Sequence, residues 1–556
     1  METEIIMKLN GAQIVTKQLL AHDATTVFGY PGGAVLPLYD ELYRNSDKIY
    51  HILTAHEQGA AHAADGYARA SGKTGVVIAT SGPGATNIVT GIASAYLDSV
   101  PMVAITANVS IALLGKDSFQ EVDIAGITQS IVKHNFVVRD VGALEHTLNE
   151  AFRLANSGRC GPVLVDIPKS VQTDVCEYIG PSPALEAKPP CSSFDAERIA
   201  MAIKGCKRPY IYAGGGVLAS GAEGELRELS ERLSAPVGLS MMGLTALPYD
   251  YRLNLGMSGM HGRYAATAAK SECDVLIALG VRFSDRATGN VNVYEEGKLI
   301  IHVDIDHAEI GKNVSSHMYV CGDVKEALTK LLPMLPPMRN DEWTARIEEL
   351  KQTERTPESG GFTPQNIIET VERFCDEDTI VTTDVGQHQM WVMQYYKFKK
   401  PRTLLTSGGL GAMGYGMGAA IGGCVAKKRR KTILFTGDGS FGMNLTELAT
   451  AVSEELPIAV VILNNGVLGM VRQWQDLFYE KRYSQTTLNR KTDFVALARA
   501  FGAEGHSAVN LQQLETILGN LPDKVPTVID CRIDVNEMVL PMIPAGGSIN
   551  DIILRG

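Results

Sequence analysis

Short, continuous runs of apolar residues recur along the whole chain, and most of them end in Gly, Pro, Asp or Asn. The first third contains VFGY, GVVIA, PMVAIT and PVLVDI, the middle contains PYIYA, DVLIAL and LIIHVD, and the last third contains TIVTT, TILFT and IAVVIL. Runs that do not alternate with polar residues are typical of strands covered on both faces. Stretches with helical spacing, such as 59–72, lie between them. The pattern therefore predicts an α/β fold of parallel sheets flanked by helices, with ligands at the carboxyl ends of the strands.

Two segments without apolar periodicity divide the chain. Residues 179–195 contain four prolines, and residues 336–364 begin with two prolines and are otherwise mostly polar and charged. We interpret both segments as linkers. They leave three blocks of ordinary domain size, which we expect to form domains at 1–180, 190–336 and 362–556.

Composition narrows the functions that this chain can have. Its 556 residues carry a net charge of −11, which argues against a basic surface for nucleic acid. The one basic run, KKRRK at 427–431, is explained more simply as a solvated turn before a strand. No stretch approaches the ~20 apolar residues of a membrane span, and METEIIMKLN does not have the pattern of a secretory signal. The nine cysteines are scattered without metal-binding spacing, so we expect a cytoplasmic protein with reduced thiols.

The strongest candidate for chemistry lies in the last block. The strand TILFT runs into Gly437-Asp438-Gly439-Ser440, a helical stretch follows, and the next strand ends in Asn464-Asn465. In such a unit the two strands are parallel, so Asp438 and Asn465 should lie at the same edge of the sheet. A carboxylate, an amide oxygen and a nearby carbonyl suit a hard cation that also binds a phosphate. The alternative, a tight turn without a ligand, explains GDG alone but not the whole spacing.

A second candidate is Glu57, in the segment HILTAHEQGAAHAADGYARA, where a predicted strand ends and a helix begins. Taken alone, Glu57 is an acid in the first turn of a helix, a position that the helix dipole favours. Two features favour a catalytic role instead: the cation- and phosphate-binding motif elsewhere in the chain, and the resemblance of HEQGAAHAADGYAR to a segment of the family described next.

Both motifs resemble those of a known family. Further segments are GYPGGAVLPLYD, TSGPGATNIVTGIASAYLDSVP, GMSGMHGRYA, ALGVRFSDRATG, VDIDHAEIGKN, SGGLGAMGYGMGAAIG, GMVRQWQ and VLPMIPAGG. Together they are similar, across nearly the whole chain, to the large catalytic subunits of biosynthetic acetolactate (acetohydroxyacid) synthases, a family of thiamine-diphosphate-dependent enzymes. The resemblance implies an N-terminal pyrimidine-binding domain, a central FAD-binding-like domain and a C-terminal domain for diphosphate and Mg²⁺.

The resemblance implies three cofactors, which are thiamine diphosphate, Mg²⁺ and FAD. Asp438, Asn465 and the carbonyl of Val467 match the magnesium ligands. Glu57 matches the glutamate that hydrogen-bonds the aminopyrimidine ring and activates the cofactor, which requires a partly desolvated carboxyl. The other residues implied to bind thiamine diphosphate are Val385 and Met413 as supports of its bent conformation, the carbonyl of Gly411, and Gln387, His388, Gly439 and Ser440 near the diphosphate.

The implied FAD site lies mainly in the middle block. Gly214 and Gly215 follow the strand PYIYA and would approach a phosphate closely, although a glycine run after a strand is weak evidence alone. The other flavin residues implied by the resemblance are Arg159, His261, Arg282, Asp304 and Asp323. In this family FAD is structural for the main reaction, with no net redox change.

Two residues are implied to recognise the second substrate. Arg286 would bind the carboxylate of the second keto acid through a planar bidentate contact, although an arginine in a loop is usually just solvated. Trp474 would favour 2-ketobutyrate over pyruvate, although it could otherwise be plain core. The remaining implied residues lie near the reacting carbon or line the approach channel, namely Gly33, Gln120, Lys169, Phe119 and Met260.

The implied reaction decarboxylates pyruvate on thiamine diphosphate and condenses the hydroxyethyl enamine with a second pyruvate or with 2-ketobutyrate. The products, 2-acetolactate and 2-aceto-2-hydroxybutyrate, feed branched-chain amino-acid (Val, Leu, Ile) biosynthesis. The resemblance also implies a homodimer or higher homo-oligomer with a shared active site, and a separate small regulatory subunit. The alternatives are an FAD-linked pyruvate oxidase, a glyoxylate carboligase-like enzyme, whose family characteristically lacks a glutamate at the position of Glu57, and a non-catalytic relative.

Overall fold

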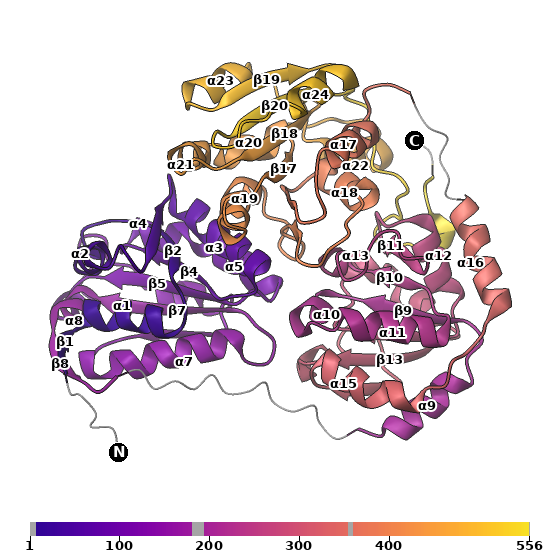
Figure 1. Cartoon of the computed structure of the whole chain (residues 1–556), viewed down its shortest axis with the longest axis horizontal. Coiled ribbons are helices and arrows are strands. Elements are labelled where there is room, and N and C mark those ends of the chain that lie inside the picture. The colour runs from indigo at the N-terminus through magenta and orange to yellow at the C-terminus, as the bar shows by residue number, and fades with distance from the viewer. Residues whose placement is uncertain (1–6, 181–193, 354–359, 555–556) are drawn as a thin grey trace.

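The computed structural model describes residues 7–180, 194–353 and 360–554. Most of the first predicted linker, and residues 354–359 of the second, lie outside this part of the chain. Three α/β units are visible in Figure 1, with the N-terminal unit in indigo and purple, the middle unit in magenta, and the C-terminal unit in orange and yellow above both.

Each unit contains a parallel six-stranded sheet, which confirms the predicted fold class. In the first unit the sheet order is β3-β2-β4-β5-β7-β6 and in the last it is β16-β15-β17-β18-β20-β19. The strands of the first sheet are β2 (Thr26–Tyr30), β3 (Tyr50–Leu53), β4 (Gly75–Ala79), β5 (Met102–Asn108), β6 (His134–Val137) and β7 (Pro162–Pro168). Those of the last are β15 (Ile380–Thr383), β16 (Leu404–Leu405), β17 (Thr432–Thr436), β18 (Ile458–Asn464), β19 (Glu504–Ala508) and β20 (Thr527–Arg532). Counted along the chain, the two sheets share one strand order, so the two units have the same topology.

The middle sheet has a different order, β11-β10-β9-β12-β13-β14. Counted along the chain this is 3-2-1-4-5-6, the order of dinucleotide-binding folds, in which the ligand lies where the order reverses. Its strands are β9 (Pro209–Ala213), β10 (Val237–Leu239), β11 (Asn254–Met257), β12 (Val275–Leu279), β13 (Leu299–Asp304) and β14 (Met318–Cys321). The reversal falls between β9 and β12.

Helices cover the faces of all three sheets (Figure 1). In the first unit they are α1 (Gly11–Ala21), α2 (Leu36–Arg44), α3 (Glu57–Ser71), α4 (Pro83–Asn87), α5 (Val89–Leu97), α6 (Ile124–Thr128), α7 (Leu144–Asn156) and α8 (Lys169–Thr173). In the middle they are α9 (Ala196–Lys204), α10 (Gly215–Ser220), α11 (Glu223–Leu233), α12 (Tyr264–Glu272), α13 (Asp285–Thr288), α14 (Val291–Glu295), α15 (Val324–Leu331) and α16 (Asp341–Thr353). In the last they are α17 (Pro364–Arg373), α18 (Gln387–Tyr395), α19 (Tyr415–Ala426), α20 (Asp438–Asn444), α21 (Glu447–Ser453), α22 (Gly469–Phe478), α23 (Phe494–Ala500) and α24 (Leu511–Leu518). A small antiparallel pair, β1 (Met7–Asn10) with β8 (Val175–Tyr178), was not predicted.

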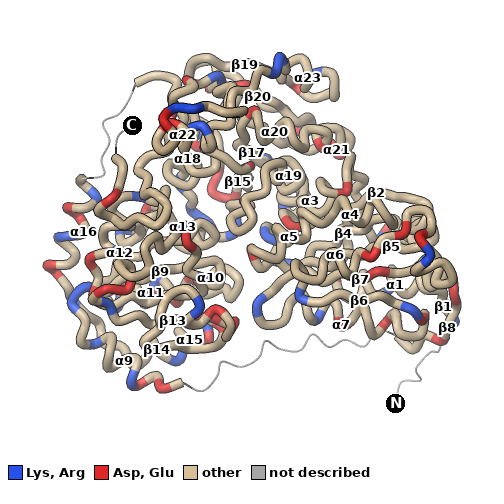
Figure 2. The backbone as a smooth tube through the Cα atoms, turned by 180° about the vertical axis from the view of Figure 1, so that it is seen from behind, with Lys and Arg blue, Asp and Glu red and all other residues tan. Residues whose placement is uncertain are grey.

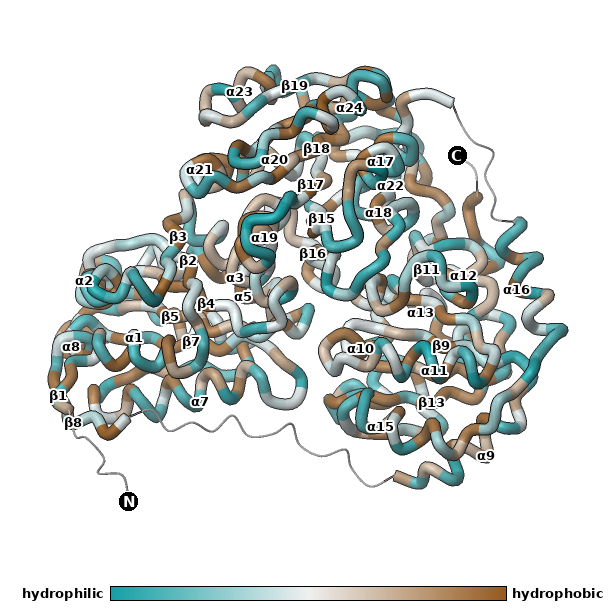
Figure 3. The backbone as a smooth tube through the Cα atoms, in the orientation of Figure 1, coloured by the Kyte–Doolittle hydropathy of each residue, from teal (hydrophilic) through white to brown (hydrophobic). Residues whose placement is uncertain are grey.

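The prediction that residues 336–364 form a linker is partly wrong, because α16 lies within this segment. Trp343, Ile347 and Leu350 are buried in the core of the middle unit, and α16 packs on α12. These three residues follow helical spacing and form a narrow apolar stripe. The rest of the helix is polar, which is why Figure 3 shows α16 mostly in teal while β13 inside the same unit is brown.

The first and last units pack through two helices rich in small residues, α3 and α19. A Cβ on Gly422 would lie 1.9 Å from the carbonyl oxygen of Ala63, and a Cβ on Gly66 would lie 2.3 Å from that of Ala419. The two helix backbones therefore touch, and larger side chains at these positions would force them apart. This contact fixes the first sheet against the last within one chain.

Charges of both signs alternate over all three units (Figure 2). The basic run at 427–431 lies in the turn between α19 and β17, as predicted. Its Arg429 pairs with Glu454, and Arg430 pairs with Asp376 and Asp378. In the described part of the chain, no helix has both the length and the apolar character to cross a membrane.

Candidate active site

The carboxyl edge of the last sheet carries the predicted magnesium residues. β17 and β18 are parallel neighbours, so Asp438 and Asn465 follow adjacent strands at one edge, and Asn465 Oδ1 accepts a hydrogen bond of 3.3 Å from the amide of Val467. Burial raises the pKa of the Asp438 carboxyl to about 6. A cation at this edge would offset that desolvation, and carboxylate, amide and carbonyl oxygens are the ligands that Mg²⁺ prefers.

Two residues of α18 support this edge. Gln387 accepts a hydrogen bond of 3.0 Å from Asn465 Nδ2 through its Oε1, and its Nε2 donates to Gln473 and to the carbonyl of Glu537. The ring of His388 is buried next to Gly437, where a Cβ would lie 3.0 Å from its Nδ1. Burial lowers the pKa of His388 to about 3, so the ring is neutral. Both residues lie where the sequence predicts a diphosphate.

The loop that leads into α19 meets the same edge. Ser440 donates a 2.7 Å hydrogen bond to the carbonyl of Val385, and a Cβ on Gly439 would lie 3.9 Å from Met413 Cε. Gly411 has a φ of +68°, which favours glycine, and a Cβ at this position would lie 3.8 Å from Val385 Cγ1. The described structure thus gathers the C-terminal residues that the sequence predicts for thiamine diphosphate.

A cavity of about 780 Å³ extends from this loop into the middle unit. Its lining includes Val385, Gly411, Met413 and Trp474 from the last unit. The middle unit contributes residues that follow all six of its strands, which is the carboxyl face on which an α/β sheet binds ligands. Predicted flavin residues that line the cavity are Arg159, Gly215, His261, Arg282, Asp304 and Asp323.

The β9–β12 crevice has the close backbone contacts of a dinucleotide site. A Cβ on Gly214 would lie 2.2 Å from the carbonyl of Gly280, so Gly214 packs β9 against β12 without lining the cavity itself. Asp304 ends β13, and burial raises the pKa of its carboxyl to about 6. His261 is half-buried, its buried Nδ1 has no partner in the described structure, and desolvation lowers the pKa of its ring to about 4. His261 lines the cavity, so a bound ligand could donate a hydrogen bond to the unpaired Nδ1 of its ring.

Arg159 reaches this cavity from the first unit. Its Nη1 lies 2.8 Å from Glu309 and 3.4 Å from Asp306, and its Nε donates to Ser99. The residue therefore joins the first unit to the strand ends of the middle unit.

Three residues predicted to lie near the second substrate meet where the middle and last units face each other. The Arg286 guanidinium lies 5.8 Å from the ring centre of Trp474, a cation–π distance, and 3.8 Å from the sulfur of Met260. The Arg286 side chain is 61% exposed, and its one ion pair within the described residues is a long one, of 3.8 Å, with Asp285. It is therefore available to bind a carboxylate at the cavity wall.

Glu57 lies apart from this assembly. Its Oε2 accepts a 2.9 Å hydrogen bond from Asn87, and its backbone begins α3. Glu57 does not line the large cavity, and neither do three further predicted residues of the first unit, Gly33, Gln120 and Lys169. Gly33 and Lys169 are exposed, as is Phe119 at 87%. Within one chain, the first-unit residues predicted to act on substrate do not meet the predicted cofactor residues.

Two acids with buried side chains, Asp98 and Glu447, support the site but were not predicted from the sequence. Asp98 accepts hydrogen bonds from the amides of Gly408 and Gly409, and it pairs at 2.9 Å with Arg69. It thereby fixes the loop that carries Gly411. Glu447 accepts from the amides of Ala55 and His56, directly before Glu57. Asp98 lies in the segment 80–101 that resembles the family, but the sequence assigns it no role. Only burial of the side chain, which the sequence does not show, distinguishes either acid from a surface acid.

The fold and the site together define a class of protein. The first and last units share one topology, and the middle unit has the strand order of a dinucleotide-binding fold. The carboxyl edge of the last sheet, with the side-chain oxygens of Asp438 and Asn465, is suited to a cation and a diphosphate, and the cavity extends from the adjoining loop into the middle unit. These are the features expected of a thiamine-diphosphate enzyme with a nucleotide-binding middle domain.

Comparison with known proteins agrees with this class. Three family models match, namely the N-terminal TPP-binding domain of thiamine pyrophosphate enzymes over residues 9–127, the central domain over 196–331 and the C-terminal TPP-binding domain over 384–531. A probable acetolactate synthase large subunit of Methanocaldococcus jannaschii is 44% identical over 98% of this chain and 95% of its own length. The acetolactate synthase isozyme 2 large subunit of Escherichia coli is 43% identical over 98% of this chain and 99% of its own length. The acetolactate synthase large subunit of Lactococcus lactis is 43% identical over 97% of this chain and 95% of its own length.

The chain therefore belongs to the family of thiamine pyrophosphate enzymes, and within it to the acetolactate synthase large subunits. The predicted family and the thiamine-diphosphate dependence are confirmed.

Proposed function

We propose that this chain is the catalytic subunit of an acetolactate synthase, which decarboxylates pyruvate and joins the two-carbon unit to a second pyruvate or to 2-ketobutyrate. The products would enter branched-chain amino-acid biosynthesis. The observation that carries the proposal is the pair Arg286–Trp474 at the wall of the cavity that contains the predicted cofactor residues. Arg286 is suited to a substrate carboxylate and Trp474 to its alkyl group.

The residues present fit Mg²⁺ and FAD as well as thiamine diphosphate. Asp438 and Asn465 follow adjacent parallel strands, and their side-chain oxygens together with the carbonyl of Val467 would hold Mg²⁺. The crevice between β9 and β12, with His261 Nδ1 open to a donor, would hold FAD. Bound thiamine diphosphate supplies the carbon nucleophile and the electron sink for decarboxylation.

The proton chemistry falls to Glu57. Asn87 donates to its Oε2, which leaves Oε1 to share a proton with a ring nitrogen of the cofactor. Glu447 holds the two amides before Glu57 and so fixes the start of α3. Arg286 then orients the second keto acid by its carboxylate, and the apolar wall around Met260 and Trp474 excludes water from the reacting centre.

We further propose that a second copy of the chain completes the site. Gly33, Gln120, Lys169 and Glu57 all belong to the first unit and do not line the cavity of their own chain. The exposed surface around Phe119 is then covered by the partner's cofactor domain, so a homodimer is the smallest active form.

A separate small regulatory subunit is the proposed second partner, since the relatives named above are large subunits. The cysteines of the described residues form no disulfide, which supports a reducing compartment such as the cytoplasm.

The proposed reaction is tested by supplying the purified chain with pyruvate, Mg²⁺, thiamine diphosphate and FAD, without an electron acceptor. We expect acetolactate, detected as acetoin after acid treatment. Strict dependence on an electron acceptor would instead identify a pyruvate oxidase. If no acetolactate forms, the assay is repeated with a small regulatory subunit added. If acetolactate is still not formed, the proposal is overturned.

Replacing Trp474 by Leu should change acceptor choice more than rate. The indole surface that contacts a longer alkyl group is lost, so the preference for 2-ketobutyrate over pyruvate should fall by roughly tenfold, as expected for lost apolar contact in a specificity pocket. Product ratios from mixed acceptors measure this directly. Phe478, whose ring centre lies 5.3 Å from that of Trp474, offers a control. Phe478→Leu should leave the ratio nearly unchanged, and equal loss in both variants would contradict the assignment.

A further inference from the structure

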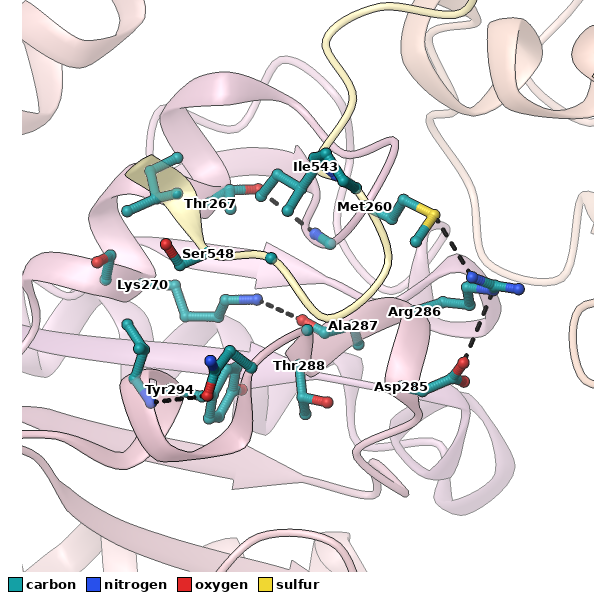
Figure 4. Close-up of a pocket in the computed structure, with 18 of the residues that line it drawn as sticks. Met260, Thr267, Lys270, Asp285, Arg286, Ala287, Thr288, Tyr294, Ile543 and Ser548 are labelled. Atoms are coloured by element: carbon teal, nitrogen blue, oxygen red, sulfur yellow. Dashed lines mark hydrogen bonds and ion pairs between the residues drawn. The ribbon is translucent and has the colours of Figure 1, made fainter. Parts of the chain in front are cut away.

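A small second pocket lies beside the main cavity and shares Met260 and Arg286 with its wall, but Lys270, Tyr294 and Lys298, which also line it, have no role in the proposed reaction. It is enclosed by α12, α13 and α14 of the middle unit and by the C-terminal segment 543–549, which covers it (Figure 4). Its volume of about 50 Å³ is several times the roughly 10–15 Å³ that one water molecule needs. The pocket can therefore hold a small molecule.

Lys270 of α12 runs through the middle of this pocket, between Ser548 on the tail and Tyr294 (Figure 4). The residue is 5% exposed. Its Nζ donates one hydrogen bond of 2.9 Å to the carbonyl of Ala287 and lies 4.9 Å from the ring centre of Tyr294 and 5.6 Å from that of Tyr212. One of its three donor positions is thus used by a carbonyl.

A second lysine lines the same pocket. Lys298 is 8% exposed, and its Nζ donates to the carbonyls of Tyr294 and Glu296. Neither Lys270 nor Lys298 forms an ion pair with a carboxylate in the described structure. Two buried ammonium groups without an opposite charge are costly, because charges removed from water need a counter-charge.

The pocket also contains a hydroxyl group without a partner. Tyr294 is buried, and its hydroxyl makes no hydrogen bond within the described residues. The lining also includes the apolar residues Val293, Ile543 and Ile549. A ligand with a small anionic head and at most a short apolar end would satisfy both the polar and the apolar lining residues.

We propose that this pocket binds a small monoanion with a carboxylate-type head, held by Lys270, Lys298 and the hydroxyl of Tyr294. A short-chain carboxylate and bicarbonate share this chemistry. The site is distinct from the carboxylate position at Arg286, although the two are neighbours, since Lys270 holds the carbonyl of the residue after Arg286.

The pH dependence of binding follows from Lys270. Burial lowers the pKa of its ammonium to about 7, whereas a bound anion favours the charged form. Binding therefore takes up a proton at neutral pH, and affinity falls as pH rises above about 7. The titratable groups around Lys270 are Tyr212, Cys273, Asp285, Arg286, Tyr294 and Lys298, with Glu296 beyond Lys298.

The test is calorimetric titration of the full chain with sodium acetate and with sodium bicarbonate, in the absence of substrate and cofactors. We expect saturable binding that is at least about tenfold weaker at about pH 8.5 than at about pH 6.5, given a lysine pKa near 7. A lower Kd for acetate would identify a carboxylate as the ligand. A lower Kd for bicarbonate would identify bicarbonate, the hydrated form of carbon dioxide. Absence of saturable binding of either anion would overturn the proposal.

Two variants place the binding in this pocket. Lys270→Met removes the ammonium and keeps a chain of similar length, a change that buried sites tolerate well, and it should abolish binding. Tyr294→Phe removes only the hydroxyl and should weaken binding several-fold. Lys330→Met, on the exposed side of α15, is the matched control and should bind as the native chain does. Undiminished binding in Lys270→Met would refute the site, whatever the outcome of the acetolactate assay.

Discussion

Replacing Glu57 by Gln should lower kcat by at least about 100-fold, the lower end of what a positioned acid–base group contributes. Glutamine keeps the shape of the side chain and can still contact Asn87, but it cannot share a proton with the cofactor. The fold should survive, because Glu57 makes one side-chain hydrogen bond and no ion pair in the described structure. Steady-state acetolactate formation measures the effect, and thermal unfolding checks the fold.

The matched control is Glu177→Gln. Glu177 lies exposed on β8 of the same unit, and the change should leave kcat within about twofold, as for surface substitutions in general. Near-native turnover by the Glu57 variant would remove Glu57 from the mechanism and leave the proton chemistry without a carrier.

Replacing Asp438 by Asn should abolish activity by weakening cofactor binding. The change removes the carboxylate that is predicted to bind Mg²⁺, and weaker cation binding would weaken binding of the diphosphate. We expect at least a 100-fold rise in the concentration of Mg²⁺ and thiamine diphosphate needed for half-maximal activity, equivalent to about 2.7 kcal/mol. Titration of each cofactor against activity, and of thiamine diphosphate against protein fluorescence, measures this rise.

Asp523→Asn serves as the control, because Asp523 is an exposed residue of the same unit. If Asp438→Asn bound both cofactors normally and still lost activity, Asp438 would act on the substrate and not as a metal ligand.

Much of the fold could be predicted because burial on both faces leaves a direct trace in sequence. Runs such as those of β4, β12 and β18 are continuously apolar, and each became a central strand. The placement of Asp438 and Asn465 at one edge of the sheet could be predicted from the strand–helix–strand spacing alone. In contrast, α16 was missed because its apolar stripe is only three residues, and β1–β8 was missed because its partners lie far apart in the chain.

The rest depends on contacts between distant segments. Nothing in the sequence pairs Asp98 with Gly408 and Gly409, or Glu447 with the start of α3. The strand order 3-2-1-4-5-6 of the middle sheet also appears only in space. Lys270 shows the same limit, since a lysine at the end of a helix is expected at the surface and is found enclosed by aromatic rings and the chain's own tail.

The central claim is that Glu57 of one subunit works with Asp438 of another. Mixing the inactive Glu57→Gln and Asp438→Asn chains under conditions of subunit exchange tests it directly. In a random mixture half of the dimers are mixed, and each mixed dimer contains one site with both residues intact, so acetolactate formation should rise to roughly a quarter of the native rate. If each site were built within one chain, no intact site could form, and a mixture no more active than its components would contradict the account.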